Sequence, residues 1–281
     1  MEQKIDIIAE LGKNFIHTEQ ELSVSENLEM AKTLVLKAKE SKATVAKFQC
    51  HVFEDEQKKR SKERWEWVKR NERATPYEEF WVPLKAYCDE LEIEFLCTPM
   101  SRMAARKISH LVKRWKVGSA DVVDYELLTY LIQYSDKPII LSTGMSTKEQ
   151  VREAVLTFMK AGKFLTLMHC VSIYPCPEEK LNLGTIAWLK RFGLPVGFSD
   201  HSLSTESPAW AIFAGCELIE KHLTLDRSAY GPDHHMSLLP EEFAEMVKKI
   251  KWAETVRGKL DKIIQEEEII LHKNFRYDHT M

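Results

Sequence analysis

Three lysines in this chain have the positions expected of a site for a small, highly charged anion. Lys47, Lys116 and Lys221 each lie within or at the end of a short apolar run. Ammonium groups bind phosphate and carboxylate oxygens as point charges, and neighbouring hydroxyl groups add hydrogen bonds. A salt bridge at the end of a strand would explain any one of these lysines alone. All three together favour a ligand such as a phosphate ester that also carries a carboxylate.

Two histidines suggest a metal site beside the lysines. His201 and His222 stand in matching positions at the ends of two further apolar runs. With a carboxylate from Glu10 or Asp233, they would form a site suited to Mn, Fe, Co or Zn. A lone histidine is more often a structural residue, so this prediction depends on the pair.

The apolar pattern that must position these residues repeats along the chain. Short runs rich in Val, Ile, Leu and Phe alternate with longer amphipathic stretches, which is typical of repeated β-α units. Eight short apolar runs fit a closed parallel barrel better than the alternative, an open doubly wound sheet. We therefore predict a single-domain α/β fold, a (β/α)8 TIM barrel over residues 1–260, with a tail or the start of a linker over residues 261–281. The predicted strands are Ile5–Glu10, Thr44–Gln49, Glu94–Cys97, Arg114–Val117, Pro138–Ser142, Phe164–Cys170, Pro195–Ser199 and Glu217–Lys221.

Amphipathic segments between these runs are predicted to be helical. Thr147 followed by Gln150 forms a capping box, and Pro240 suits a first helical turn. The predicted helices include Asn27–Glu40, Tyr77–Leu91, Tyr125–Tyr134, Thr147–Lys160, Ser204–Ala214 and Pro240–Val256.

The segment 53–75 breaks the β-α rhythm. It is dense in Glu, Lys and Arg and carries Trp65 and Trp67. Because it follows a predicted strand, it is either a solvated helical excursion or a lid over the barrel mouth.

Polar residues end nearly every predicted strand. In a (β/α)8 barrel the carboxyl ends of the strands converge on one mouth, which is where active sites form. A buried charge costs several kcal/mol unless it is paired, so a barrel built only for stability has no need of such a ring. The residues are Glu10, Asn14, Lys47, Gln49, Thr98, Lys116, Ser119, Asp121, Ser142, Ser172, Tyr174, His201, Glu220, Lys221 and His222.

Composition excludes several other classes of protein. The 281 residues include 40 basic and 43 acidic side chains, so the net charge of −3 gives no reason to expect a nucleic-acid or membrane partner. The sequence has neither a run of roughly 20 apolar residues nor the layout of a signal peptide at its start. The six cysteines are scattered and match no zinc spacing, so we expect reduced thiols in a cytoplasmic protein.

Several short motifs run in a fixed order from residue 5 to about residue 245. They are Ile8-Ala9-Glu10-Leu11-Gly12-Lys13-Asn14, Lys47-Phe48-Gln49, Cys97-Thr98-Pro99, Lys116-Val117-Gly118-Ser119, Leu141-Ser142-Thr143-Gly144-Met145, His169-Cys170-Val171-Ser172-Ile173-Tyr174-Pro175, Gly197-Phe198-Ser199-Asp200-His201, Glu220-Lys221-His222-Leu223-Thr224-Leu225-Asp226 and Gly231-Pro232-Asp233-His234. Each motif is short, but the ordered set resembles the sialic acid synthase family.

The resemblance implies a barrel that joins phosphoenolpyruvate to an open-chain amino sugar of the N-acetylmannosamine type. The products are a nonulosonic acid and free phosphate, and the family is usually a homodimer. A divalent metal, most often Mn²⁺ with Mg²⁺ or Co²⁺ as alternatives, would be bound by His201 and His222.

The resemblance also implies roles for the remaining residues of the ring. Glu10, Lys47, Lys116 and Lys221 would be catalytic, with Glu10 as a base near the aldehyde or the attacking water. The substrate-binding residues would be Asn14, Gln49, Thr98, Ser119, Asp121, Ser142, Ser172, Tyr174 and Asp233.

Three departures from the family pattern fall on the sugar side. Phe15, not His, follows Asn14, and His17 comes two residues later. Asp121 stands where Glu is common, and Ser172 where Asn is common. Family members also usually continue into an antifreeze-protein-like domain. The sequence ends at residue 281, about where the linker to such a domain would begin, so we expect either a truncated chain or a naturally short protein. These differences leave the acceptor sugar open more than the reaction.

Three alternatives to this reading are open. A sister synthase would use phosphoenolpyruvate with a different, possibly phosphorylated, sugar aldehyde. A Schiff-base aldolase would use Lys116 or Lys221 without a metal. A binding relative without catalysis is the third alternative, which Lys47, His201 and His222 count against.

Overall fold

The strands of the chain form a parallel barrel in the computed structural model, which describes residues 5–16, 20–258 and 261–275. His17 lies outside the described residues. All eight predicted strands are confirmed, with ends that differ by a few residues. They are β1 (Asp6–Gly12), β2 (Val45–Cys50), β3 (Glu94–Pro99), β4 (Trp115–Val117), β5 (Ile139–Ser142), β6 (Leu165–Cys170), β7 (Val196–Asp200) and β8 (Leu218–His222).

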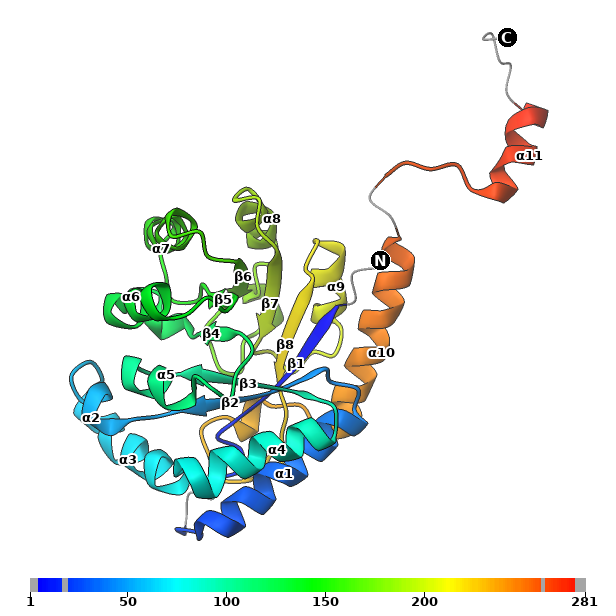
Figure 1. Ribbon diagram of the computed structural model, residues 1–281. Helices are drawn as coiled ribbons and strands as arrows, with labels where there is room; N and C mark the ends of the chain where they lie inside the picture. The colour runs from blue at the N-terminus through cyan, green and yellow to red at the C-terminus, as the bar shows by residue number, and fades with distance from the viewer. Residues whose placement is uncertain (1–4, 17–19, 259–260, 276–281) are drawn as a thin grey trace.

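The order of the strands shows how the barrel closes. The sheet runs β3-β2-β1-β8-β7-β6-β5-β4, and every hydrogen-bonded neighbour is parallel. The first and last strands of the chain are therefore paired, and β3 also contacts β4 across the remaining seam. Helices surround the strands (Figure 1). The predicted single-domain (β/α)8 barrel is confirmed, and the open doubly wound sheet is excluded.

Several helices begin where a capping side chain binds their free N–H groups. Ser23 and Glu26 form a capping box at the start of α1, and Thr147 and Gln150 form the predicted one at α7. The helices are α1 (Val24–Glu40), α2 (Phe53–Glu56), α3 (Trp65–Ala74), α4 (Val82–Glu90), α5 (Arg102–Ile108), α6 (Tyr125–Tyr134), α7 (Lys148–Lys160), α8 (Thr185–Lys190), α9 (Ser207–Phe213), α10 (Pro240–Arg257) and α11 (Glu266–Phe275).

Three predicted helices have different starts in the structure, and the one predicted from Asn27 begins earlier, at Val24. The segment predicted as Tyr77–Leu91 opens with a π-helical turn, Tyr77–Trp81, before α4. The segment predicted to begin at Ser204 becomes helical only at Ser207, because the preceding serines bind backbone N–H groups in turns. The charged segment 53–75 is helical, as α2, a 3₁₀ turn and α3.

The two faces of the strands carry different side chains, because successive residues of a strand point to opposite sides. Outward residues pack against the helices in the main hydrophobic core. Inward residues near the strand starts form a small apolar cluster of Ile8, Val45, Leu96, Ile140, Met168 and Leu218. Two residues further along each strand, the next inward row is polar, so the fold itself concentrates charge at the mouth.

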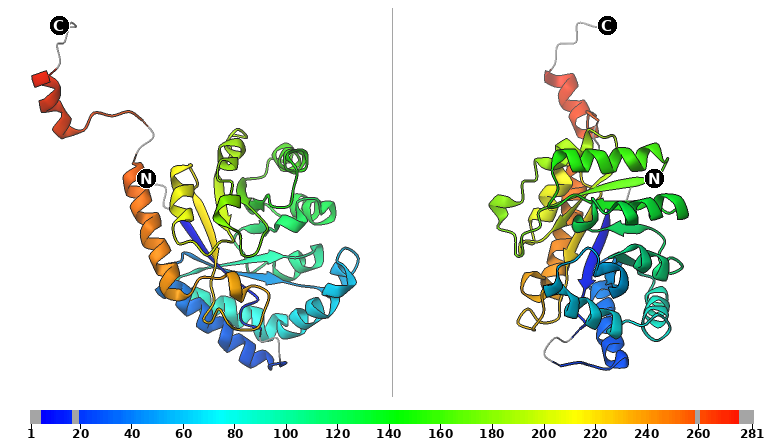
Figure 2. Two further views of the ribbon diagram at one scale, coloured as in Figure 1. Left: turned by 180° about the vertical axis from the view of Figure 1, so that it is seen from behind. Right: turned by 90° about the vertical axis from the view of Figure 1, so that its left-hand side faces the viewer.

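The C-terminal helix stands apart from the barrel. α10 packs against α9 and α1, whereas α11 lies beyond its end in the views of Figures 1 and 2. Ile270 and Phe275 of α11 are 65% and 83% exposed. Among the described residues, no helix is both long and apolar enough to cross a membrane. All six cysteines, each within the described part, are buried and unpaired.

Candidate active site at the barrel mouth

The centre of the mouth is a glutamate held between two lysines. Glu220 of β8 has its Oε1 3.5 Å from Nζ of Lys47 on β2 and its Oε2 3.7 Å from Nζ of Lys116 on β4. The hydroxyl of Ser199 on β7 donates to Oε1 of Glu220 at 3.1 Å. All three charged side chains are almost fully buried. Four strands thus bring one charged cluster together inside the barrel.

The charges of this cluster depend on one another. Burial alone would raise the pKa of Glu220, but the neighbouring Lys116 and Lys47 outweigh it and lower the pKa to about 2. Burial also opposes the charge on Lys47, yet Glu10 and Glu220 raise its pKa above the ordinary value. The pKa of Lys116 is lowered, because burial outweighs the attraction of Glu220. Lys116 is therefore the less compensated of the two ammonium groups.

Hydroxyl groups from adjoining strands complete the surroundings of the two lysines. Lys47 donates to Thr98 Oγ1 at 3.2 Å, and Lys116 donates to Ser142 Oγ at 2.6 Å. Lys47 also pairs with Glu10 Oε2 at 2.5 Å. Glu10, Lys47 and Lys116 were predicted to be catalytic and Thr98 and Ser142 to bind substrate, and the structure brings these five residues into one network.

Three predicted site residues, Glu10, Gln49 and Asp233, meet beside Gly12. Gln49 donates its amide N–H to Glu10 Oε1 at 2.7 Å. A methyl group added at Gly12 would lie 2.9 Å from Glu10 Oε1, 3.2 Å from Asp233 Oδ2 and 3.4 Å from Gln49 Nε2. Gly12 also has a φ of +45°, a backbone conformation that residues with a side chain rarely adopt. The glycine therefore lets two carboxylates and an amide approach one another closely.

A second group of small residues lies where β4, β5 and β6 end. Ser119 Oγ is 2.9 Å from Cys170 Sγ and accepts a hydrogen bond from the Gly144 N–H at 3.2 Å. A methyl group on Gly144 would lie 2.5 Å from Ser172 Oγ and 2.6 Å from Cys170 Sγ, so no larger residue fits. Ser172 Oγ is buried and has no hydrogen-bond partner among the described residues.

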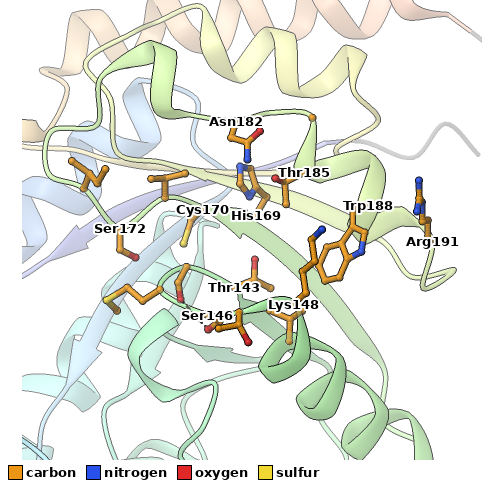
Figure 3. A pocket seen from close by; sticks show the side chains of 17 residues that line it. Thr143, Ser146, Lys148, His169, Cys170, Ser172, Asn182, Thr185, Trp188 and Arg191 are labelled. Atoms are coloured by element: carbon orange, nitrogen blue, oxygen red, sulfur yellow. Dashed lines mark hydrogen bonds between the residues drawn. The ribbon is translucent and has the colours of Figure 1, made fainter.

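A cavity of about 920 Å³ opens from this group toward the outside (Figure 3). Its inner end is formed by Cys170 and Ser172, and its outer end by Lys148, Trp188 and Arg191. The cavity therefore connects the barrel mouth with solvent between α7 and α8.

The two predicted metal ligands are neighbours. The ring centroids of His201 and His222 are 5.6 Å apart, and Tyr174 packs on His201 at 4.4 Å. Nδ1 of His201 is 2.8 Å from the carbonyl oxygen of Val171. Burial, and to a lesser degree His222, lower the pKa of His201 to about 4, so the ring is neutral with Nδ1–H as the donor. Its Nε2 then carries a free electron pair.

The described residues contain no ready-made group of three His, Cys, Asp or Glu side chains that could hold a metal ion. The two histidines nevertheless suit such an ion. Nδ1 of His222 is buried and has no partner among the described residues, and Nδ1–H of His201 donates to a backbone carbonyl oxygen, as the second ring nitrogen of a ligating histidine usually does. Two imidazoles would leave the other positions of a bound metal to water and substrate.

Three predicted site residues are not brought into the centre. Lys221 points to the outer face, where its ammonium group pairs with Asp200 at 2.7 Å. The side-chain amide of Asn14 donates to the carbonyl oxygen of Leu223 at 2.8 Å and to Ser237 Oγ at 3.1 Å, joining the loops after β1 and β8.

Asp121 is the third of these residues. Its Oδ1 pairs with Arg60 at 2.5 Å, while Oδ2 is buried without a hydrogen-bond partner in the described part of the chain. Burial raises the pKa of Asp121 to about 6, although Arg60 opposes this. Arg60 lies between α2 and α3, so the charged segment 53–75 reaches across to the loop after β4.

Glu220 is the functional candidate to which the sequence analysis gave no role. It is the central carboxylate of the mouth, and the spacing of residues in β8 could have predicted it. Glu220 and His222 are two residues apart in one strand, so both face the same side, and Lys221 faces the other.

Fold and site together define a (β/α)8 barrel whose mouth holds paired lysines and glutamates beside two histidines. Residues 34–262 match the model of the NeuB family, so the chain belongs to this family. The resemblance inferred from the motifs is thereby confirmed.

Individual relatives cover most of the chain. An uncharacterised protein of Methanocaldococcus jannaschii is 38% identical over 89% of this chain and 73% of its own length. The N,N'-diacetyllegionaminic acid synthase of Legionella pneumophila is 34% identical over 95% of this chain and 80% of its own. Among solved structures, an N-acetylneuraminic acid (sialic acid) synthetase of Leptospira borgpetersenii in complex with citrate has a TM-score of 0.87 and 31% identity. That likeness covers 98% of this chain and 93% of the other.

Proposed function

We propose that this chain condenses phosphoenolpyruvate with an N-acetylmannosamine-type sugar aldehyde, forming a nonulosonic acid and phosphate. The observation that carries the proposal is the buried cluster of Lys47, Lys116 and Glu220 with its surrounding hydroxyl groups. The relatives named as legionaminic acid synthase and sialic acid synthetase support the same class of reaction.

Phosphoenolpyruvate would bind at the two lysines. Lys47 and Lys116 offer ammonium groups to its phosphate and carboxylate, and Thr98, Ser142 and Ser119 offer hydroxyl groups. The cavity lined by Gly144 and Cys170 opens to solvent next to Ser119.

The chain's own residues account for the subsequent steps. C3 of phosphoenolpyruvate attacks the aldehyde carbon, which leaves a cationic centre at C2. Glu10, an ion-paired carboxylate oriented by Gln49, removes a proton from the water that adds to C2. The tetrahedral intermediate then expels phosphate by cleavage of the C2–O bond, and Lys47 and Lys116 stabilise the charge that develops on the leaving group. One water is consumed: its proton neutralises the alkoxide formed from the aldehyde, and the C2 hydroxyl proton is lost with the phosphate as the C2 carbonyl forms.

His201 and His222 would hold a divalent metal, for which Mn²⁺ is the first candidate, with Mg²⁺ and Co²⁺ as alternatives. When bound, such an ion polarises a carbonyl oxygen as a Lewis acid. Its positive charge would also matter for binding. The charges of Lys47 and Lys116 are already balanced by Glu10 and Glu220 in the protein alone, so an anionic substrate benefits from an additional cation.

The sugar would lie between Tyr174, Asp233, Gln49 and Ser172, which surround the approach to Glu10 and the histidines. The most direct rival is a sister synthase with a different or phosphorylated acceptor, because it would share the phosphoenolpyruvate site. A Schiff-base aldolase is favoured only by burial, which lowers the pKa of Lys116 and of Lys221. From the family resemblance, we also propose a homodimer that works in the cytoplasm.

The product formed in ¹⁸O-labelled water tests this chemistry. Addition of water at C2 places one labelled oxygen in the sugar acid and none in the released phosphate. Label in the phosphate would show cleavage of the P–O bond and would contradict the proposal. Reduction with borohydride in the presence of substrate should give no stable link to Lys116, whereas a Schiff-base aldolase would be trapped.

A further inference from the structure

A second buried polar cluster lies beside the lysine–glutamate centre and is not used in the steps above. Its members are Lys13, which follows β1, His51, which follows β2, and Glu56 of α2. They are 6%, 1% and 1% exposed. Because residues that follow barrel strands lie on the mouth side, both strand ends place this cluster on the active-site face.

His51 is fixed in one orientation. Its Nδ1 is 3.0 Å from both carboxylate oxygens of Glu56, and Glu56 Oε1 also accepts a hydrogen bond from the Val52 N–H at 3.1 Å. Burial lowers the pKa of His51, although Glu56 opposes this. The ring is therefore neutral, with Nδ1–H directed at Glu56. Nε2 is left as a buried acceptor with no hydrogen-bond partner among the described residues.

Lys13 is a buried cation that also lacks a matching partner. Its Nζ lies 5.6 Å from the centre of the Trp67 ring on α3, and it forms no hydrogen bond or ion pair with the residues that the structure describes. Burial lowers the pKa of Lys13, and Asp233 and Glu10 oppose this. Those two carboxylates meet beside Gly12, the residue before Lys13. Lys13 is therefore within electrostatic range of the side on which the sugar is proposed to lie.

One unsatisfied buried acceptor, Nε2 of His51, and one cation without an ion pair, Lys13, point to a missing partner. A buried donor or acceptor without a hydrogen bond loses its hydration without compensation, which natural proteins rarely tolerate away from binding sites. Each of these groups also feels the other, since the charge of Lys13 lowers the pKa of His51.

Resting on the proposed function, we propose that Lys13 and His51 bind one hydroxyl group of the acceptor sugar. Lys13 donates to the hydroxyl oxygen, and the hydroxyl hydrogen is donated to Nε2 of His51. A hydroxyl group both accepts and donates, as this pair requires. A phosphate or carboxylate dianion would have no hydrogen to donate to Nε2 of His51, although Lys13 and Arg64 would attract its charge. The part of the acceptor bound here is therefore an uncharged polyol.

The Lys13→Met variant tests this proposal, because methionine keeps the unbranched stem but removes the ammonium group. We expect the KM for the acceptor to rise about tenfold or more, the loss typical of a hydrogen bond to a charged group, with the KM for phosphoenolpyruvate changed less than about twofold. The matched control is Lys62→Met. Lys62 also lies over a tryptophan of this segment, 5.8 Å from the Trp65 ring, but is exposed. It should leave both KM values unchanged.

Acceptor analogues that each lack one hydroxyl group provide a second measurement that needs no variant. One analogue should bind wild-type protein about tenfold more weakly than the parent sugar and should lose nothing further with Lys13→Met. If every such analogue binds wild-type protein as well as the parent sugar, or if Lys13→Met leaves the acceptor KM unchanged, this inference is wrong while the synthase function stands. Absence of sugar-dependent phosphate release by wild-type protein would instead contradict the proposed function itself.

Discussion

Replacing Glu220 by Gln removes the carboxylate shared by two buried lysines and keeps its shape. Lys47 would retain Glu10 at 2.5 Å, whereas Lys116 would be left with Ser142 and no carboxylate in contact. Removing one partner of a buried ion pair typically costs about 3–5 kcal/mol, because the remaining charge is uncompensated. The shift in the pKa of Glu220 leads to a similar free-energy cost. Its fall from 4.5 to about 2 corresponds to about 3 kcal/mol at about 1.4 kcal/mol for each factor of ten.

The expected loss is therefore about 3 kcal/mol at pH 7, or roughly 6 °C in Tm for a chain of this size. Burial already lowers the pKa of Lys116, so this lysine loses its proton more easily in the variant. That release of charge limits the loss of stability. Because the pKa of Glu220 is depressed in the folded protein, its stabilisation is present above about pH 4.5 and is lost as the pH falls toward 2. The difference between wild type and Glu220→Gln should therefore narrow between pH 5 and pH 3.

Urea unfolding at several pH values measures this difference directly. The control is Glu245→Gln, which removes an exposed carboxylate from its ion pair with Lys249 and should not change the midpoint measurably. A Glu220→Gln protein as stable as wild type at pH 7, or a loss of stability that is the same at pH 7 and pH 3.5, would refute the electrostatic reasoning.

Three further variants separate the roles of other residues. Gly12→Ala places a methyl group 2.9 Å from Glu10 Oε1 at a φ of +45°. We expect kcat/KM to fall at least about tenfold while the circular dichroism spectrum stays native. Unchanged kinetics would mean that the methyl group does not displace Glu10. Lys221→Met leaves the buried Asp200 without its ion-pair partner. We expect the free energy of unfolding in urea to fall by about 3–5 kcal/mol, with an unchanged KM for phosphoenolpyruvate. A folded variant that no longer binds phosphoenolpyruvate would support the catalytic role predicted for Lys221. Glu10→Gln should lower kcat by about a hundredfold or more with little change in phosphoenolpyruvate affinity, and normal turnover would rule Glu10 out as the base.

Hydrophobic periodicity was sufficient to predict the barrel and most of its centre. Eight short apolar runs gave the strands, and residues at their ends gave Lys47, Lys116 and Glu10 as neighbours. It was harder to predict on which side of a strand a residue lies, because this prediction requires the register of the strand as well as its position in the sequence. Lys221 was therefore grouped with the inward lysines, and its neighbour Glu220 was given no role.

Long-range contacts of irregular segments could not be predicted from local pattern. Asp121 was expected to face the sugar, yet it pairs with Arg60 from the charged segment 53–75. The amide of Asn14 likewise binds loop residues far along the chain. Both outcomes depend on how loops after different strands meet over the mouth, and no sequence periodicity encodes that.

Release of phosphate from phosphoenolpyruvate, measured with and without Mn²⁺ across N-acetylhexosamines and phosphorylated sugars, tests the central claim most directly. The account predicts release that requires both a divalent metal and a sugar, with an unphosphorylated N-acetylmannosamine-type aldehyde as the preferred acceptor. Failure of wild-type protein to bind phosphoenolpyruvate, or release of phosphate at the same rate without any sugar, would contradict it.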